Sequence, residues 1–321
     1  MTCMKRFWKQ IFARGIQWFL ALLSIALVLT ACNPGEQTPV DYVFDDLGRL
    51  VAINGTPQRI ISLAPSNTEI LYALGLEERV VGVTDWCNYP LEALDKEKVG
   101  NYDTPDMEKI VALNPDLILV AYGTTMDVIN SLVGLGLTVF GIKTTDLDDL
   151  LNDIQTVGEI TDKEVEAQAL TSEIENRIEA VTDVTLALAE RPKVFYIVWH
   201  DPLWTAGSGN FIHELIEKAG GVNICQNITG YVTISIEEVV ARDPEIIITS
   251  SWPGVYEWAM NSTELEVTAA RQSGSVYTCD DDLVQRPGPR LVEGLEWFAH
   301  FIHPEIFEEP EGSQMKVFPG L

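Results

Sequence analysis

The stretch Met107-Glu-Lys-Ile-Val-Ala-Leu-Asn-Pro-Asp-Leu-Ile-Leu119 aligns without gaps with Ile236-Glu-Glu-Val-Val-Ala-Arg-Asp-Pro-Glu-Ile-Ile-Ile248. Each copy begins with a short amphipathic helix pattern, which a proline ends because the residue before proline disfavours the helical conformation. An apolar run follows in both copies and predicts a buried strand. The chain therefore contains two equivalent helix–strand units, which predicts two lobes related by pseudo-symmetry.

The sequence around the first copy alternates between predicted strands and predicted helices. Strands are predicted at 59–63, 80–83 and 117–121, with helices at 70–74 and 106–113. Ser66 and Glu69 have the spacing of a capping box before the first helix. Alternation of this kind predicts an α/β fold with a parallel sheet covered on both faces.

The domain organisation follows from these patterns. A predicted hairpin at 42–53 lies in a segment, 32–56, that begins with a Pro/Gly-rich tether. We expect an N-terminal α/β lobe at 57–160, a C-terminal α/β lobe at 191–308 and a tail at 309–321.

A long helix is predicted between the lobes. Residues 161–190 contain neither glycine nor proline and end before Pro192. As one helix they would span about 45 Å at the standard rise. A helix of this length predicts a rigid connection between the lobes with little domain closure.

The first 31 residues are typical of an export signal. Four basic residues precede an apolar run at 18–29, which is shorter than the roughly 20 residues that a transmembrane helix needs. The run ends in Leu29-Thr-Ala-Cys32 and resembles a bacterial lipoprotein signal, in which the cysteine is lipidated. We expect a signal peptide at 1–31 and an exported protein anchored to the membrane by lipid on Cys32; the alternative is an uncleaved anchor.

The charge of the chain restricts its partners. The formal net charge is −27, and loss of the four basic residues of the signal makes it −31. So negative a chain disfavours nucleic acid as a partner. Cys87, Cys225 and Cys279 would remain beside Cys32, an odd number that leaves at least one thiol free and the pairing open.

Aromatic residues gather in the loops expected at the ends of strands. They are Trp86, Tyr89, Tyr102, Tyr122, Trp199, Trp204 and Tyr231. Ligands of open α/β sheets bind beyond the carboxyl ends of the strands, and large rings suit a planar or macrocyclic ligand. His200 lies in one of these loops, where its imidazole could reach the metal of a macrocycle or simply pair with Asp201.

The motifs of common enzymes are absent from the sequence. It has no Gly-x-Ser-x-Gly, His-Glu-x-x-His or Walker motif, and no Gly-x-Gly-x-x-Gly after a predicted strand. A site for a bare metal ion would need His200 and His213 to meet a further ligand. We therefore predict no catalytic residue, no metal site and no resident cofactor, and a protein that is not an enzyme.

Several segments resemble the substrate-binding proteins of ABC importers for cobalamin, haem and ferric siderophores. They are Arg59-Ile-Ile-Ser-Leu-Ala-Pro-Ser-Asn-Thr-Glu69, Val81-Gly-Val83, Tyr89-Pro90, Glu108-Lys-Ile-Val-Ala-Leu-Asn-Pro-Asp-Leu117 and Arg286-Pro-Gly-Pro-Arg290. The likeness covers about residues 57–308 and is greatest to the cobalamin-binding branch. It implies two Rossmann-like lobes bridged by one long helix, with the ligand in the cleft between them.

The resemblance also implies roles for individual residues. Those that match positions around the corrin ring are Trp86, Tyr102, Tyr122, Trp204 and Tyr231, and Trp199 and His200 complete our candidate ligand-binding set. Trp86 and Tyr102 depart from the pattern, since the best-known cobalamin binders carry Tyr and Trp there. Glu108 and Glu237 match the glutamates that engage arginines of the permease dimer, which works with ATPase subunits.

Two alternatives stay open at this point. A haem or ferric-siderophore binder would share the fold, and an anionic siderophore would favour basic cleft residues, of which the aromatic loops show none. A two-lobed metalloenzyme with a nitrogenase-like fold would need clustered cysteine or histidine ligands.

Overall fold

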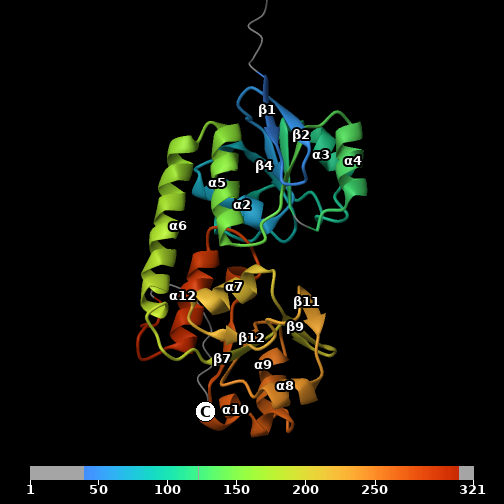
Figure 1. Ribbon diagram of the computed structural model, residues 1–321. Helices are drawn as coiled ribbons and strands as arrows, with labels where there is room; N and C mark the ends of the chain where they lie inside the picture. Colours follow the sequence, from blue (N-terminus) through green and yellow to red (C-terminus); the bar gives the residue numbers. More distant parts are fainter. Residues whose placement is uncertain (1–39, 122, 311–321) are drawn as a thin grey trace, which may run out of the picture. The chain divides into compact units, whose positions relative to one another are not determined.

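The structure, a computed structural model, describes residues 40–121 and 123–310 (Figure 1). The expected signal peptide, the lipidation site Cys32 and the aromatic candidate Tyr122 lie outside the described residues. Among the helices that are described, none has the length and hydrophobicity to cross a bilayer.

The N-terminal lobe contains a four-stranded parallel sheet with the strand order β4-β3-β5-β6. The strands are β3 (Ile60–Ser62), β4 (Val80–Val83), β5 (Leu117–Ala121) and β6 (Val139–Ile142). The helices are α2 (Pro65–Ala73), α3 (Met107–Ala112), α4 (Met126–Gly134) and α5 (Leu147–Thr161). Leu117 and Leu119 belong to the apolar cluster that includes α2 and α5, whereas Ile118 and Val120 belong to the cluster that includes α3 and α4. The sheet is therefore covered on both faces, as its apolar strands predicted.

The C-terminal lobe repeats this arrangement with a second parallel sheet, in the order β10-β7-β12-β13. Its strands are β7 (Lys193–Ile197), β10 (Val222–Asn223), β12 (Ile246–Ser250) and β13 (Val276–Cys279). Its helices are α7 (Phe211–Lys218), α8 (Ile236–Arg242), α9 (Val255–Asn261), α10 (Ala269–Ser273), α11 (Asp281–Val284) and α12 (Leu291–Ile302). In both lobes the first strand of the sheet lies between the second and the third.

Two small sheets and three short helical turns complete the described elements. An antiparallel sheet of β8 (Trp199–His200), β9 (Leu203–Ala206) and β11 (Tyr231–Thr233) follows β7, and β1 (Val40–Phe44) pairs with β2 (Leu50–Asn54). The 3-10 turns are η1 (Glu77–Arg79), η2 (Leu91–Asp95) and η3 (Leu265–Val267).

The two copies of the internal sequence repeat also form equivalent hydrogen bonds. The N-caps of α3 and α8 are Asp106 and Ser235, and each side chain accepts a hydrogen bond from the backbone three residues later. Asn114 and Asp243, which follow these helices, have left-handed φ values of 46° and 50°. Both are residue types that tolerate this conformation. Two sequence copies thus fold into two equivalent units.

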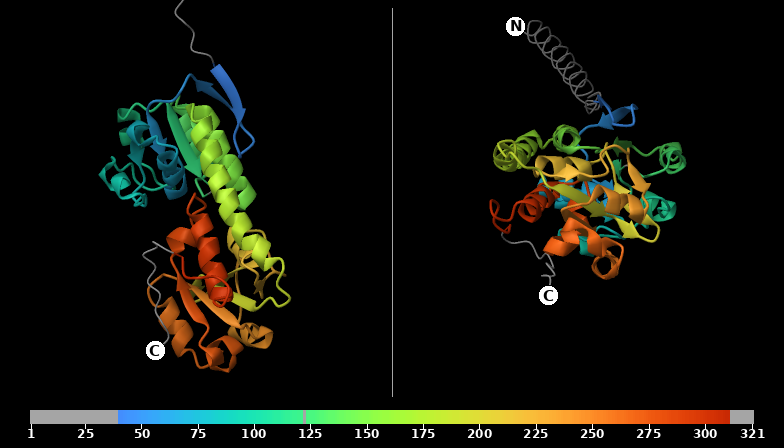
Figure 2. Two further views of the ribbon diagram at one scale, coloured as in Figure 1. Left: turned by 90° about the vertical axis from the view of Figure 1, so that its left-hand side faces the viewer. Right: turned by 60° about the horizontal axis from the view of Figure 1, so that its bottom comes forward.

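The long helix between the lobes, α6 (Glu164–Thr185), is shorter than the expected 161–190. Asp162 adopts a left-handed φ of 61° and ends α5, so α6 is a separate helix of 22 residues, about 33 Å long. The sequence analysis missed this break because it looked for glycine or proline. The break occurs at an aspartate, a residue type that can also adopt the left-handed conformation. Figure 2 shows α5 and α6 side by side. Arg177 of α6 binds Glu296 of α12 through hydrogen bonds of 2.8 and 2.7 Å, so α6 is also attached to the C-terminal lobe.

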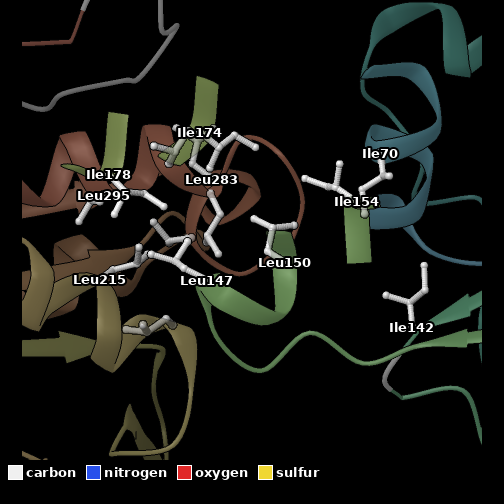
Figure 3. Packing of buried hydrophobic residues seen from close by; sticks show 14 of the residues in the cluster. Ile70, Ile142, Leu147, Leu150, Ile154, Ile174, Ile178, Leu215, Leu283 and Leu295 are labelled. Atoms are coloured by element: carbon white, nitrogen blue, oxygen red, sulfur yellow. The ribbon is translucent and has the colours of Figure 1, made fainter. Parts of the chain in front are cut away.

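One apolar cluster continues from the N-terminal lobe into the C-terminal lobe. Figure 3 shows Leu147 and Leu150 of α5 near Leu215 of α7 and Leu283 of α11. Ile174 of α6 belongs to the same cluster. Since the lobes share buried apolar side chains, separating them would expose apolar surface to water, which is unfavourable.

The capping box expected at Ser66 and Glu69 is wrong. Helix α2 begins two residues earlier, at Pro65, with Ala64 as an N-cap that makes no side-chain hydrogen bond. Proline is favoured at the first helical position, where its missing N–H costs nothing. The Glu69 side chain therefore does not cap the helix N-terminus and binds Arg290 instead.

Candidate functional site

A cavity of about 770 Å³ is lined by residues of both lobes. The N-terminal lobe contributes Ala64, Pro65, Ser66, Tyr102, Ala121, Ile142, Lys143, Thr144 and Thr145. The C-terminal lobe contributes Val198, Trp204, Gly209, Asn210, Phe211, Gly230, Tyr231, Gln285, Arg286 and Pro287. Its volume is in the range of small-molecule and cofactor sites.

The cavity lies at the carboxyl ends of strands from both sheets. Ala121 ends β5, Lys143 follows β6 directly, and Val198 follows β7. The carboxyl ends of parallel strands meet at one edge of a sheet, where the loops form a crevice for ligands. The pseudo-symmetric lobes thus place their ligand-binding edges around one cavity.

Three of the predicted aromatic residues line this cavity. They are Tyr102, Trp204 and Tyr231, whose exposed fractions are 42, 37 and 41%. Tyr231 of β11 pairs with Ala206 of β9, two residues after Trp204, so both rings project from the same face of the small antiparallel sheet. Half-exposed rings on one face offer a flat apolar surface to a ligand.

The other aromatic candidates lie elsewhere. Trp86 is 55% exposed and does not line the cavity. Trp199 and His200 form β8, outside the cavity lining, with ring centroids 4.6 Å apart. His200 also stacks on Trp258 at 5.7 Å, and its Nδ1 is buried without a hydrogen-bond partner among the described residues. The ligand-binding roles of Trp86, Trp199 and His200 stay predictions.

Sequence reasoning missed several residues of the cavity wall. They include the cations Lys143 and Arg286 and the aromatic Phe211 at the start of α7. Neither cation lies in the aromatic loops, which were the only part of the cleft that the sequence analysis searched for basic residues. Lys143 directly follows the apolar run of β6. This position at the carboxyl end of a strand, where ligands bind, could have identified Lys143 as a candidate from the sequence.

A polar network lies behind the Arg286 side of the cavity. The Arg286 guanidinium donates one hydrogen bond to the Asn88 amide oxygen at 2.6 Å and contacts the Asp282 carboxylate at 2.7 Å. Arg290 donates two hydrogen bonds to Glu69, at 2.6 and 3.0 Å. Burial raises the pKa of Glu69, against the opposing effect of Arg290. The network connects α2 of the N-terminal lobe to the segment before α12.

The two predicted docking residues occupy equivalent places on the lobes. Glu108 lies in the first turn of α3 and Glu237 in the first turn of α8, and both are exposed. In the described part of the chain, neither carboxylate forms an ion pair. Both are available to positive groups of another protein.

The described cysteine and histidine side chains do not assemble into a metal site. Cys87, Cys225 and Cys279 are buried free thiols. Burial raises the pKa of the Cys279 thiol well above its usual value. The His213 ring faces the Asn223 amide at 3.5 Å. Within residues 40–121 and 123–310, no group of three metal-binding side chains is assembled.

Residues 60–283 match the family model of periplasmic binding proteins. The chain belongs to this family. This periplasmic binding protein is 34% identical over 310 residues to the uncharacterized ABC transporter substrate-binding lipoprotein YvrC of Bacillus subtilis, which covers 90% of this chain and 97% of YvrC. It is 31% identical to the vitamin B12-binding protein of Vibrio parahaemolyticus, over 78% of this chain and 92% of the relative.

Solved structures agree with the family assignment. The vitamin B12-binding protein BtuF of Vibrio cholerae matches this periplasmic binding protein with a TM-score of 0.68 and 30% identity, over 77% of this chain and 97% of that structure. The haem-binding protein BhuT matches with a TM-score of 0.72 over 78% of this chain and 99% of that structure, but at 24% identity it shares the fold alone. The chain thus has the two-lobed α/β fold of extracytoplasmic proteins that bind substrates for ABC importers.

Proposed function

We propose that this protein captures cobalamin or a related corrinoid in the cavity between its lobes and delivers it to the permease of an ABC importer. The observation that carries the proposal is the cavity of about 770 Å³ with Tyr102, Trp204 and Tyr231 in its wall. Aromatic rings bury a large apolar area with little loss of conformational entropy, which suits the broad face of a corrin. The relatives named as vitamin B12-binding proteins support the same ligand.

The proposed role is binding and release without chemical change. The relatives named above are binding proteins, and the sequence carries no common catalytic motif. The apolar cluster shared by the lobes favours a cleft that is preformed, so that little of the binding free energy is lost in ordering the protein.

The proposal includes an importer partner and a membrane anchor. Glu108 and Glu237 are exposed at equivalent places on α3 and α8, which suits a permease dimer that presents an arginine to each. Lipid on Cys32 would hold the exported protein at the membrane near that permease. The relative named as a lipoprotein supports this location.

A visible absorption titration tests the proposed ligand. Protein lacking residues 1–32 is mixed with cyanocobalamin and, separately, with haemin, and affinity and stoichiometry are measured by calorimetry. We expect saturable binding of one cyanocobalamin per chain, with weaker or no binding of haemin. Binding of haemin alone would overturn the cobalamin proposal.

Haem is the second candidate ligand, because the cavity holds two cations. Lys143 and Arg286 line the wall, and basic groups suit the propionate carboxylates of haem. The same titration decides between the two ligands.

A further inference from the structure

The cavity wall carries positive charge in a strongly acidic protein. The chain has a formal net charge of −27. Among the described residues that line the cavity, none is an aspartate or a glutamate, whereas Lys143 and Arg286 are cations. The wall thus has the opposite charge to the protein as a whole, which favours a negatively charged group on the ligand.

Of these two cations, Lys143 is the one without a carboxylate partner. Arg286 already contacts the Asp282 carboxylate at 2.7 Å and the Asn88 amide at 2.6 Å. Lys143 is exposed, and its ammonium makes no hydrogen bond or ion pair within the described residues. The uncompensated positive charge of the wall is therefore that of Lys143.

Three carboxyl groups near Lys143 bind backbone or hydroxyl groups of residues 143–145. Asp46 accepts a hydrogen bond from the Lys143 backbone N–H at 2.8 Å. Asp149 accepts from the Thr145 backbone at 3.0 Å, and Asp153 accepts from the Thr144 hydroxyl at 2.5 Å. Burial, and then the side-chain hydrogen bond with Asp46, raises the pKa of Asp153 to about 8. These three carboxyl groups therefore bind backbone and hydroxyl groups and not the Lys143 ammonium.

The start of α7 is attached to the loop that carries Lys143. The backbone N–H of Leu147 donates to the Glu214 carboxylate at 2.8 Å, which attaches the loop after Lys143 to α7. Asn210 and Phe211, at the N-terminus of α7, line the cavity. The N-terminus of a helix is the positive end of its dipole and stabilises anions.

We propose that Lys143 forms an anion subsite of the cavity and pairs with a negatively charged substituent of the ligand. Resting on the proposed corrinoid function, we assign this substituent as the phosphodiester of the nucleotide loop. A complete cobalamin carries this group, and cobinamide lacks it. A haem propionate is the other source of an anion for the same subsite.

Calorimetry with two corrinoids tests the subsite. Affinities for cyanocobalamin and dicyanocobinamide are measured with wild-type protein, Lys143→Met and Lys143→Arg, at low and high salt. We expect Lys143→Met to weaken cyanocobalamin binding about tenfold, as for the loss of a hydrogen-bonded charge, and to leave cobinamide binding nearly unchanged. Lys143→Arg should retain most of the affinity. Salt should weaken cyanocobalamin binding to the wild type more than to Lys143→Met.

Lys193→Met is the matched control, because Lys193 is an exposed lysine outside the cavity wall. It should bind both corrinoids like the wild type, and unchanged melting temperatures would show that both methionine variants fold. Equal losses for the two corrinoids in Lys143→Met, or no loss for either, would overturn the subsite.

A failure of the corrinoid proposal gives a different result. If the wild type binds neither corrinoid, the proposed function is wrong, and the subsite is then tested with haemin. Weaker haemin binding by Lys143→Met would support an anion subsite for a propionate, whereas unchanged haemin binding would overturn it.

Discussion

Glu69 of α2 and Arg290, 221 residues later in the chain, form a bidentate ion pair between the two lobes. The Glu69 side chain is almost completely buried, and the Arg290 guanidinium lies 3.7 Å from the centre of the Tyr89 ring. A Cβ atom on Gly288 would lie 3.2 Å from the Glu69 carboxylate, so the connecting segment passes close to the pair. The pair therefore holds the segment 285–287, which lines the cavity, against α2.

Glu69→Ala should strongly destabilise the protein. It leaves the Arg290 charge buried without a partner, which costs about 3–5 kcal/mol for buried ion pairs. Unfolding in urea measures the loss, and Glu69→Leu combined with Arg290→Met should recover much of it. Glu238→Ala, which removes one partner of the exposed pair with Arg242, is the control and should cost much less. A loss below about 1 kcal/mol in Glu69→Ala would show that the pair is not a structural contact.

The stability of the protein should fall as the pH rises towards 8. Burial raises the pKa of Asp153 to about 8 from an ordinary value of 3.8, so the folded state holds a proton that the unfolded state releases. Its contribution to stability is complete below pH 4 and is lost as the pH rises through 8. Burial also raises the pKa of Asp281, to about 6, and the pKa values of Glu69 and Glu214, so a variant of Asp153 is needed to assign the slope to this residue.

Asp153→Asn should flatten this pH dependence, because asparagine has no proton to lose. Urea unfolding of both proteins at pH 5, 6, 7 and 8 measures the slope, which for one proton is at most about 1.4 kcal/mol per pH unit. Identical slopes above pH 6 in the two proteins would contradict the raised pKa.

Trp204→Ala should weaken cobalamin binding about tenfold or more. Burying an aromatic side chain contributes about 1.5–3 kcal/mol by its apolar area, and Trp204 lines the cavity beside Tyr231. Trp86→Ala is the informative comparison, because Trp86 lies outside the cavity wall. Its affinity should change less; calorimetry showing the larger loss in Trp86→Ala would place the ligand elsewhere.

Charge reversal at both docking residues should separate binding from transport. Glu108→Arg with Glu237→Arg should leave cobalamin affinity intact, because neither residue lines the cavity. Uptake, or stimulation of the importer's ATPase, should collapse, because two like-charged groups would face the permease arginines.

A competing explanation is that Glu108 and Glu237 only stabilise the N-termini of their helices. An acid in the first turn of a helix stabilises it by about 0.3–1 kcal/mol through the helix dipole. That explanation predicts a lower melting temperature with transport retained. Near-normal transport by the double variant would therefore contradict docking.

Cys32→Ala should release the protein from membranes or leave its signal unprocessed. The predicted lipid anchor would require the thiol of Cys32, to which the lipid would be attached. Fractionation of cells, followed by mass analysis of the N-terminus, measures both effects. Normal cleavage after Ala31 with unchanged membrane retention would exclude the lipoprotein anchor.

Much of the fold was determined by local sequence. The apolar runs of β5 and β12 and the prolines before them define two equivalent helix–strand units, because strand and helix formation depend on neighbouring residues. The ends of a helix were harder to predict where one residue is compatible both with continuing the helix and with ending it. Asp162 could continue a helix or end one, and only its left-handed backbone separates α5 from α6.

Only the tertiary structure decided which side chains share the cavity. Tyr102, Trp204 and Tyr231 come together there while Trp86 does not, since this depends on how loops from distant strands pack. The sequence suggested that Glu69 caps a helix, but its partner is Arg290, and no local pattern encodes a contact across 221 residues. Lys143 gained its significance because the nearby carboxyl groups bind backbone and hydroxyl groups rather than its ammonium. Backbone conformation follows from nearby residues, whereas the pairing and burial of charges depend on long-range packing.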